Sequence, residues 1–260
     1  MDGRLAGRSA VVTGGAMGIG AGIAAELARE GANVLIGDID DAAASETATA
    51  LDAGSRVDAM HCDVSREDDV LRLMDEASSR FGALHIVVNN AAVGIYKSVV
   101  EATVEEFDHA LAVNLRGVFL GIKHAAPHLE AAGGGSVINI ASVHSVQNVG
   151  GTAPYAASKG GVAALTRASA VDLARAGIRV NAICPGWIDT PLIRGIFASA
   201  PDAEQMKRDV ERRQLLGRLG TPEEIGRVAV FLASDDASYV TGSLLFADAG
   251  MTAQLETWSE

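Results

Sequence analysis

Residues 13–20 read Thr13-Gly-Gly-Ala-Met-Gly-Ile-Gly20, a glycine-rich segment that directly follows the apolar run Ser9-Ala-Val-Val12. A strand, a glycine turn and a helix in this order can bind an anion, because the free N–H groups at the helix N-terminus face the turn. The glycines are spaced G-x-x-x-G-x-G, whereas the common dinucleotide-binding turn is G-x-G-x-x-G. The segment is therefore either an ordinary tight turn or a longer version of a phosphate-binding turn.

Outward from this turn, short apolar runs alternate with Ala-, Leu- and Glu-rich segments at helical spacing. The runs are continuously apolar, which is typical of parallel strands buried on both faces. Repeated βα units predict a single α/β domain over residues 1–260, a doubly wound Rossmann-type sheet with right-handed crossovers. The expected strands are residues 9–13, 33–37, 56–62, 84–89, 136–141, 179–184 and 243–247.

Composition and charge exclude several classes of protein. The chain has 260 residues, 48% of them hydrophobic, and a formal net charge of −12, which argues against disorder, nucleic-acid binding and anionic membrane surfaces. Its two cysteines form neither a metal set nor a disulfide framework. No signal-peptide core and no apolar stretch of about 18 residues is present. We expect a cytoplasmic protein without a metal.

Asp38 ends the second expected strand, about 20 residues beyond the glycines, where a carboxylate can accept hydrogen bonds from a ribose diol. Residues 13–20 contain no Arg or Lys, and Ile39 follows Asp38. A 2′-phosphate would need a cation there. The pattern favours NAD over NADP, with the alternative that Asp38 merely caps the next helix.

Tyr155-Ala-Ala-Ser-Lys159 places a tyrosine and a lysine four residues apart, on one face of a helix. A nearby ammonium lowers the pKa of a phenol, which makes the tyrosine a candidate acid–base. Ser142 closes the fifth expected strand, where its hydroxyl could bond the same substrate oxygen. Asn114 lies inside a helix-like segment, where asparagine is unfavourable without a hydrogen-bonding reason.

In this order and spacing, the motifs resemble the short-chain dehydrogenase/reductase family, in its form of about 250 residues with Y-x-x-x-K, over nearly the whole chain. The opening turn then corresponds to the glycine turn of that family. The motifs that carry the resemblance are residues 13–20, Asp63, Asn89-Asn-Ala-Ala-Val93, Asn114, Ser142, Tyr155 with Lys159, Asn181, Pro185-Gly-Trp-Ile-Asp-Thr190 and Asp248-Ala-Gly250.

The resemblance implies a seven-stranded parallel sheet of order 3-2-1-4-5-6-7 and a set of site residues. Tyr155 would be the acid–base, Ser142 would orient the substrate oxygen, Lys159 would lower the tyrosine pKa and bind the nicotinamide ribose, and Asn114 would hold a water. Asp63 and Val64 would bracket the adenine, Asn90 would contact the adenosine side, and Ile188 and Thr190 the carboxamide. The implied cofactor positions are Gly14, Met17, Gly18, Ile19, Gly20, Asp38, Ile39, Asp63, Val64, Asn90, Ala91, Ala92, Tyr155, Lys159, Pro185, Gly186, Ile188 and Thr190.

Residues 187–216, an irregular insertion after the sixth strand, are expected to form a substrate lid. The candidate substrate-binding residues are Ser142, His144, Gln147, Tyr155, Trp187, Ile193 and Phe197, with the alternative that the loop residues at 144–148 are ordinary solvated polar groups. Where the family often has glycine, this chain has Ala92 and Ala249, so backbone strain is expected if Ala92 requires a positive φ.

The expected activity is NAD-dependent exchange of a hydride between nicotinamide C4 and a secondary alcohol or its ketone, with a sugar, polyol or cyclic alcohol as substrate. A carrier-protein 3-oxoacyl thioester reductase is the enzymatic alternative. Such enzymes tend to use NADP and to present arginines to an acidic carrier protein. At the positions where those arginines would be expected, this chain has Leu120 and Val171. A non-catalytic NAD-binding sensor or scaffold is the alternative of another class. The resemblance also implies a homotetramer built through the helices around residues 110–131 and 155–176, together with the last helix and strand.

Overall fold

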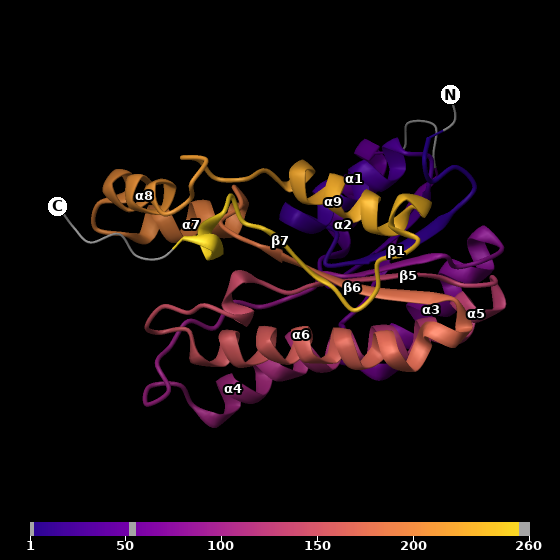
Figure 1. The fold of residues 1–260 in the computed structure, drawn as a ribbon, viewed down its shortest axis with the longest axis horizontal. Helices are drawn as coiled ribbons and strands as arrows, with labels where there is room; N and C mark the ends of the chain where they lie inside the picture. Colours follow the sequence, from indigo (N-terminus) through magenta and orange to yellow (C-terminus); the bar gives the residue numbers. More distant parts are fainter. Residues whose placement is uncertain (1–2, 52–55, 255–260) are drawn as a thin grey trace.

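The computed structural model describes residues 3–51 and 56–254 as one layered α/β fold (Figure 1). Its centre is a seven-stranded parallel sheet of order β3-β2-β1-β4-β5-β6-β7, which confirms the expected architecture. The strands are β1 (Ser9–Thr13), β2 (Asn33–Asp38), β3 (Val57–His61), β4 (Ile86–Asn89), β5 (Gly135–Ile140), β6 (Ile178–Pro185) and β7 (Leu244–Ala247). Every residue of β1 and β4 is buried, as the continuous apolar runs predicted.

Helices cover both faces of the sheet, as Figure 1 shows. One apolar core lies under α1, α2 and α9, and the other under α3, α5 and α6. The helices are α1 (Gly18–Arg29), α2 (Asp41–Leu51), α3 (Glu67–Phe81), α4 (Val104–Leu111), α5 (Gly117–Ala131), α6 (Ala153–Leu173), α7 (Pro191–Ser199), α8 (Ala203–Arg212) and α9 (Pro222–Ala233). A π-helix, η1 (Ala112–Arg116), joins α4 to α5, and the short 3₁₀ turn η2 (Val143–Ser145) follows β5.

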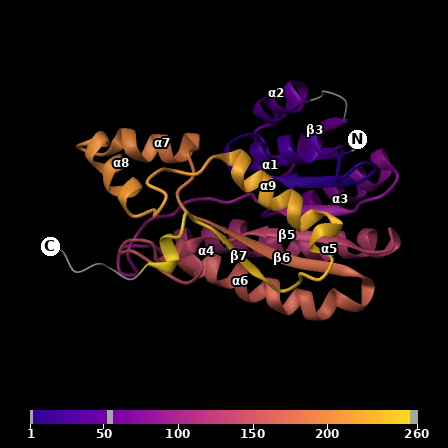
Figure 2. The ribbon, with the colours of Figure 1, turned by 45° about the horizontal axis from the view of Figure 1, so that its top comes forward.

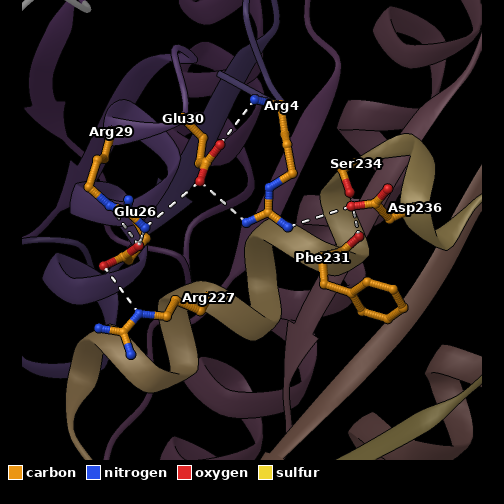
Figure 3. Close-up of polar contacts among 8 residues, drawn as sticks. All are labelled: Arg4, Glu26, Arg29, Glu30, Arg227, Phe231, Ser234 and Asp236. Carbon is orange, nitrogen blue, oxygen red and sulfur yellow. Dashed lines mark hydrogen bonds and ion pairs between the residues drawn. The ribbon is translucent and has the colours of Figure 1, made fainter. Parts of the chain in front are cut away.

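Ion pairs join the N-terminal part of the chain to the end of α1, and α1 to α9 (Figure 3). Glu26 of α1 pairs with Arg29 and lies 3.8 Å from Arg227 of α9, while Glu30 pairs with Arg4 at 3.3 Å. A Cβ at Gly226 would lie 2.6 Å from Glu26 Cγ, so the two helices approach at this glycine. Most of these charges are exposed and contribute little. The close packing at Gly226 holds α1 against α9.

Residues 187–216 differ from the expected irregular insertion, because they contain two helices, α7 and α8, which lie beside the sheet in Figure 2. Thr190 Oγ1 accepts from the Ile193 N–H at 3.4 Å, and Pro191 follows it as the first helical residue. Asp202 Oδ1 accepts from the Gln205 N–H at 2.8 Å. Both cap residues are visible in the sequence, so the prediction was wrong because proline and glycine were read only as helix breakers.

Candidate active site

The glycine turn between β1 and α1 has two glycines that the packing of the chain itself requires. Gly14 has φ +64°, and a Cβ there would lie 2.7 Å from Ala91 Cα. A Cβ at Gly20 would lie 2.0 Å from the carbonyl oxygen of Gly14. Gly18 has φ +57°, and a Cβ there would lie 3.4 Å from the Thr190 methyl group, so the start of the 187–216 segment faces the turn.

Thr13 and Asn90 hold this turn in place. The Thr13 hydroxyl accepts from the Asn90 N–H at 3.0 Å and from the Ala91 N–H at 3.2 Å. The Asn90 side-chain amide donates to the carbonyls of Thr13 at 2.9 Å and Gly14 at 2.8 Å. Both donor hydrogens of the amide are thereby used, so the Asn90 side chain builds the turn, a role that the sequence alone did not indicate.

The N-terminus of α1 fits a phosphate group. Its N-cap residue, Met17, makes no side-chain hydrogen bond to the first turn of the helix, and the Met17 side chain is exposed. The N–H groups of Ile19 and Gly20, which a capping side chain would bond, therefore lack the usual capping oxygen, and the helix dipole favours an anion beside them. This observation agrees with a bound pyrophosphate at the turn.

Asp38, at the end of β2, does not cap the next helix. Its carboxylate accepts from the Ala16 N–H at 3.0 Å, inside the glycine turn, and from the Asp40 N–H at 3.1 Å. Asp40 takes the capping position of α2, because its Oδ1 accepts from the Ala43 N–H at 3.0 Å. The alternative of Asp38 as a helix cap is therefore wrong, and its two oxygens retain acceptor capacity toward a ribose. Ile39 is exposed beside it.

Asp63 and Val64 follow β3 at the same edge of the sheet. The Asp63 carboxylate accepts from the N–H and the hydroxyl of Ser65, at 2.9 and 2.7 Å. Burial acts to raise the pKa of Asp63, but these bonds outweigh it, and the pKa lies below its ordinary value. Val64 is buried, and the position of a Cβ at Gly117 lies 3.0 Å from it.

Ser142, Tyr155 and Lys159 converge at the carboxyl edge of β5 and the first turns of α6. Lys159 is only 2% exposed, and its ammonium donates to the carbonyl of Ile140 at 2.7 Å. The same nitrogen lies 5.7 Å from the centre of the Tyr155 ring. Ser142 lies two residues beyond the end of β5, is buried, and accepts from the His144 N–H at 3.2 Å. The structure thus brings the three residues together. The sequence predicted Tyr155 and Lys159 as a pair from their helical spacing, and Ser142 from its place at the end of a strand.

Burial sets the electrostatics of this cluster. It raises the pKa of the Tyr155 phenol above its ordinary value, with the Tyr96 phenol acting in the same direction and a Ser142 hydrogen bond acting against it. Burial also lowers the pKa of Lys159 from 10.5 to about 8. In the free protein, loss of hydration is therefore the largest influence on the pKa of both residues.

Asn114 lies in the π-helix η1 and is completely buried. Its side-chain oxygen accepts from the Val93 N–H at 2.8 Å, and its amide donates to the Val93 carbonyl at 2.9 Å and the Ser158 hydroxyl at 3.1 Å. The side chain therefore joins the loop after β4 to α6. These hydrogen bonds account for an asparagine inside a helix. A π-helical turn, moreover, often marks a functional position.

Of the other candidate substrate-binding residues, His144 contacts the ring of Tyr155. Its ring meets the Tyr155 ring edge-on at 5.7 Å, and its Nδ1 lies 3.2 Å from Asn148 Oδ1. Trp187 and Phe197 stack on each other at 6.2 Å, and Ile193 is partly buried. The exposed Gln147 donates to the carbonyl of Thr252 at 3.3 Å, which ties the loop to the C-terminal turn.

Backbone hydrogen bonds hold the ends of the 187–216 segment in place. Ile188 and Gly220 form a bridge in which the Asp189 N–H donates to the Gly220 carbonyl, and the Gly220 N–H to the Trp187 carbonyl, both at 2.9 Å. Pro185 ends β6, and the Gly186 N–H donates to the carbonyl of Ala247 at 3.1 Å. Within this segment the buried Gln214 amide nitrogen has no hydrogen-bond partner among the described residues.

Backbone strain lies at Ala249 and not at Ala92. Ala249 has φ +53° and is the only non-glycine residue at positive φ in the part of the chain that the structure describes. Its carbonyl accepts from the Leu215 N–H at 2.9 Å, which attaches the end of the 187–216 segment to the turn after β7. No such strain arises at Ala92, because its backbone does not adopt the left-handed conformation.

Membrane-spanning helices and metal sites are both absent from the described ranges, 3–51 and 56–254. No helix there is both long and apolar enough to traverse a lipid bilayer. No group of three or more His, Cys, Asp or Glu side chains in these ranges is arranged to hold a metal ion.

Comparison with known proteins identifies the family. A family model described as enoyl-(acyl carrier protein) reductase matches residues 14–252. The cis-4-hydroxycyclohexanecarboxylate dehydrogenase of Sinomonas cyclohexanicum is 42% identical over 247 residues, 95% of this chain and 97% of the relative. The cyclohexanol dehydrogenase of Acinetobacter sp. (strain SE19) is 37% identical over 256 residues, 98% of each chain.

A solved structure agrees with both matches. The crystal structure of levodione reductase superposes with a TM-score of 0.93 at 34% identity, covering 96% of this chain and all of that one. The chain therefore belongs to the short-chain dehydrogenase/reductase family, whose members are oxidoreductases that use a nicotinamide cofactor.

Proposed function

We propose that this protein is an NAD-dependent dehydrogenase that exchanges a hydride between nicotinamide C4 and the secondary hydroxyl, or ketone, of a cyclic alcohol. The observation that carries the proposal is the convergence of Ser142, Tyr155 and the buried Lys159 at the sheet edge where α1 begins without a capping side chain. In open α/β sheets, ligands bind at this edge. The cofactor supplies the hydride acceptor, and the protein supplies orientation and proton transfer.

The cofactor would lie along the carboxyl edge of the sheet. Its pyrophosphate would face the turn from Gly14 to Gly20 that includes Met17, and its adenosine ribose would bond Asp38. Preference for NAD follows because a 2′-phosphate would meet the Asp38 carboxylate with no cation nearby in the turn. The adenine would lie by Ile39, Asp63 and Val64, the chain at 90–92 would contact the adenosine side, and Lys159 with Tyr155 would bind the nicotinamide ribose. Pro185, Gly186, Ile188 and Thr190 would surround the carboxamide.

Proton transfer would occur at the Tyr155 oxygen. Ser142 would hold the substrate oxygen, and the alcohol proton would pass to the Tyr155 phenolate as the hydride leaves the carbon. With its pKa at about 8, Lys159 is mostly protonated at neutral pH and favours that phenolate. Because the Asn114 side chain is occupied by three protein contacts, a relay water at this position would bond the main chain of η1.

A cyclic alcohol is the substrate class best supported. The relatives described above are named for cyclohexanol, a hydroxycyclohexanecarboxylate and levodione, and they match nearly the whole chain. The rings of Tyr155 and His144 offer apolar surface beside the reacting group. A carrier-protein reductase, which the family model's description names, is disfavoured because like charges slow the encounter of an acidic carrier with a chain of net charge −12.

Two further expectations belong to this proposal. The 187–216 segment would close over substrate as a lid, with Trp187, Ile193 and Phe197 as its apolar contacts. A homotetramer would pair through α5 and α6, which expose Phe119 and Val171 respectively. Apolar side chains exposed on long helices are common at such interfaces.

The test is initial-rate kinetics on cyclohexanol, cyclopentanol and open-chain secondary alcohols, with NAD and NADP separately. NAD-dependent oxidation of a cyclic alcohol is expected, and Tyr155→Phe, which removes only the hydroxyl, should lower kcat by about 10² or more while NAD still binds. Tyr239→Phe is the matched control, since Tyr239 is fully exposed. Near-normal turnover by Tyr155→Phe would show that another group moves the proton.

A further inference from the structure

Tyr96 lies beside the catalytic tyrosine, although the sequence alone offered no reason to select it. Its ring centre is 5.4 Å from that of Tyr155, with the two planes tilted by 52°. The His144 ring contacts Tyr155 edge-on at 5.7 Å. The catalytic phenol is therefore packed against two other rings, each of which carries a polar atom.

The segment that carries Tyr96 is anchored at both ends to the catalytic elements. Upstream, the backbone of Val93 makes two hydrogen bonds with the side chain of Asn114, at 2.8 and 2.9 Å. Downstream, the carbonyl of Lys97 accepts from the N–H of Ala153, the first residue of α6, at 3.0 Å, and the Lys97 ammonium pairs with Glu106 at 2.6 Å. These contacts hold the loop that carries Tyr96 against the start of α6, next to Tyr155.

Gly94 provides the space that the Tyr96 ring occupies. A Cβ at Gly94 would lie 2.7 Å from one ring carbon and 3.0 Å from the hydroxyl oxygen of Tyr96. Gly94 does not have a positive φ, so the conformation of the backbone does not require glycine there. The glycine instead permits the ring to fold back over the chain toward Tyr155.

The Tyr96 hydroxyl is available to a ligand. It has no hydrogen-bond partner within residues 3–51 and 56–254, and the side chain remains 43% exposed. The partial burial raises the pKa of the phenol above its ordinary value, so the hydroxyl stays protonated at neutral pH and can donate as well as accept. A neutral hydroxyl beside the reacting centre suits a neutral or anionic oxygen of the substrate.

We propose that Tyr96 is a substrate-binding residue whose hydroxyl bonds a second oxygen substituent on the ring of a cyclic alcohol, while the reacting hydroxyl lies at Tyr155. The inference rests on the proposed function and narrows its substrate class to ring alcohols that carry another hydroxyl, oxo or carboxylate group. A site built to bond a substrate hydroxyl discriminates against the analogue that lacks it, because its own polar group is then left unpaired.

The test compares cyclohexanol with cyclohexane-1,2-diol and cyclohexane-1,4-diol as substrates of the whole protein with NAD. Tyr96→Phe keeps the ring and removes the hydroxyl. It should raise KM and lower kcat/KM by roughly tenfold for the preferred diol, and change the values for cyclohexanol by less than about twofold. Gly94→Ala keeps the Tyr96 hydroxyl but displaces the whole ring, and it should show the same selective loss of kcat/KM for the diol. Tyr239→Phe is the control.

Two failures can be told apart. If the unmodified protein oxidises the alcohols but Tyr96→Phe lowers kcat/KM equally for diol and cyclohexanol, or for neither, the role of Tyr96 is overturned and the dehydrogenase activity stands. If the unmodified protein oxidises no cyclic alcohol, the proposed function is overturned, and this inference with it.

Discussion

Replacing the buried Lys159 by methionine should stabilise the fold while it removes activity. The pKa of Lys159 is lowered from 10.5 to about 8 in the folded protein. Because the folded state binds this proton less tightly than the unfolded state, the charge costs stability at every pH below 8. That cost disappears as the pH rises from 8 to about 10.5. Lowering this pKa from 10.5 to about 8 corresponds to roughly 3 kcal/mol of lost stability at pH 7.

The substitution removes this cost, but part of the stability that it gains is lost again. Lys159→Met leaves the carbonyl of Ile140 without the ammonium that now lies 2.7 Å away, which costs about 1–2 kcal/mol. The net free energy of unfolding should therefore rise by about 1–2 kcal/mol at pH 7. At pH 9.5 most of the stability cost of the lysine charge is gone. The difference in free energy of unfolding between the variant and the wild type should therefore change by about 2 kcal/mol, relative to pH 7, in favour of the wild type.

Urea unfolding of both proteins at pH 7 and pH 9.5, at one fixed protein concentration, measures this difference. Lys207→Met is the matched control, because the Lys207 side chain is half exposed and its ion pair with Glu211 is long, at 4.0 Å. It should show no such pH dependence. If the stability of Lys159→Met parallels that of the wild type between the two pH values, the ammonium carries no burial cost and the electrostatic description above is wrong.

Three other outcomes are expected. Ala249→Gly should raise the free energy of unfolding by about 0.5–1 kcal/mol in urea, because relief of the left-handed backbone exceeds the added chain entropy; a loss of stability would contradict this. Asp38→Ala should narrow the ratio of kcat/KM between NAD and NADP by about tenfold or more; an unchanged ratio would exclude Asp38 as the discriminating group. In hydrogen exchange, amides of residues 187–216 should gain protection with NAD and substrate together, and unchanged protection would argue against a lid.

The fold was predictable because the buried strands and the glycine turn are encoded locally. The seven apolar runs correspond to the seven strands, with ends that differ by no more than two residues. Tyr155 and Lys159 were predicted as a pair, since four residues of helix place them on one face whatever the rest of the fold does. Periodicity and short spacing are properties of the chain itself, and they do not depend on distant contacts.

What could not be predicted depends on contacts between distant segments. Tyr96 reaches Tyr155 only because two anchors, separated in the sequence, hold the loop after β4 against α6. Asn90 was assigned to the cofactor, and its use in holding the Thr13 and Gly14 carbonyls requires the β1 and β4 ends to be adjacent. The raised pKa of Tyr155 depends on burial, which the spacing of two residues does not specify.

The same burial gives the proposed reaction its order of events. In the free protein the phenol of Tyr155 holds its proton, because its raised pKa makes phenolate unfavourable near neutral pH. The positive charge of an oxidised nicotinamide beside the ring would favour phenolate, and it would also weaken proton binding by Lys159, whose pKa is already lowered to about 8. Tyrosine and lysine would then titrate as a coupled pair, so that the ionisation seen in a pH–rate profile belongs to both residues. The base would thus form only in the complex that also holds the hydride acceptor.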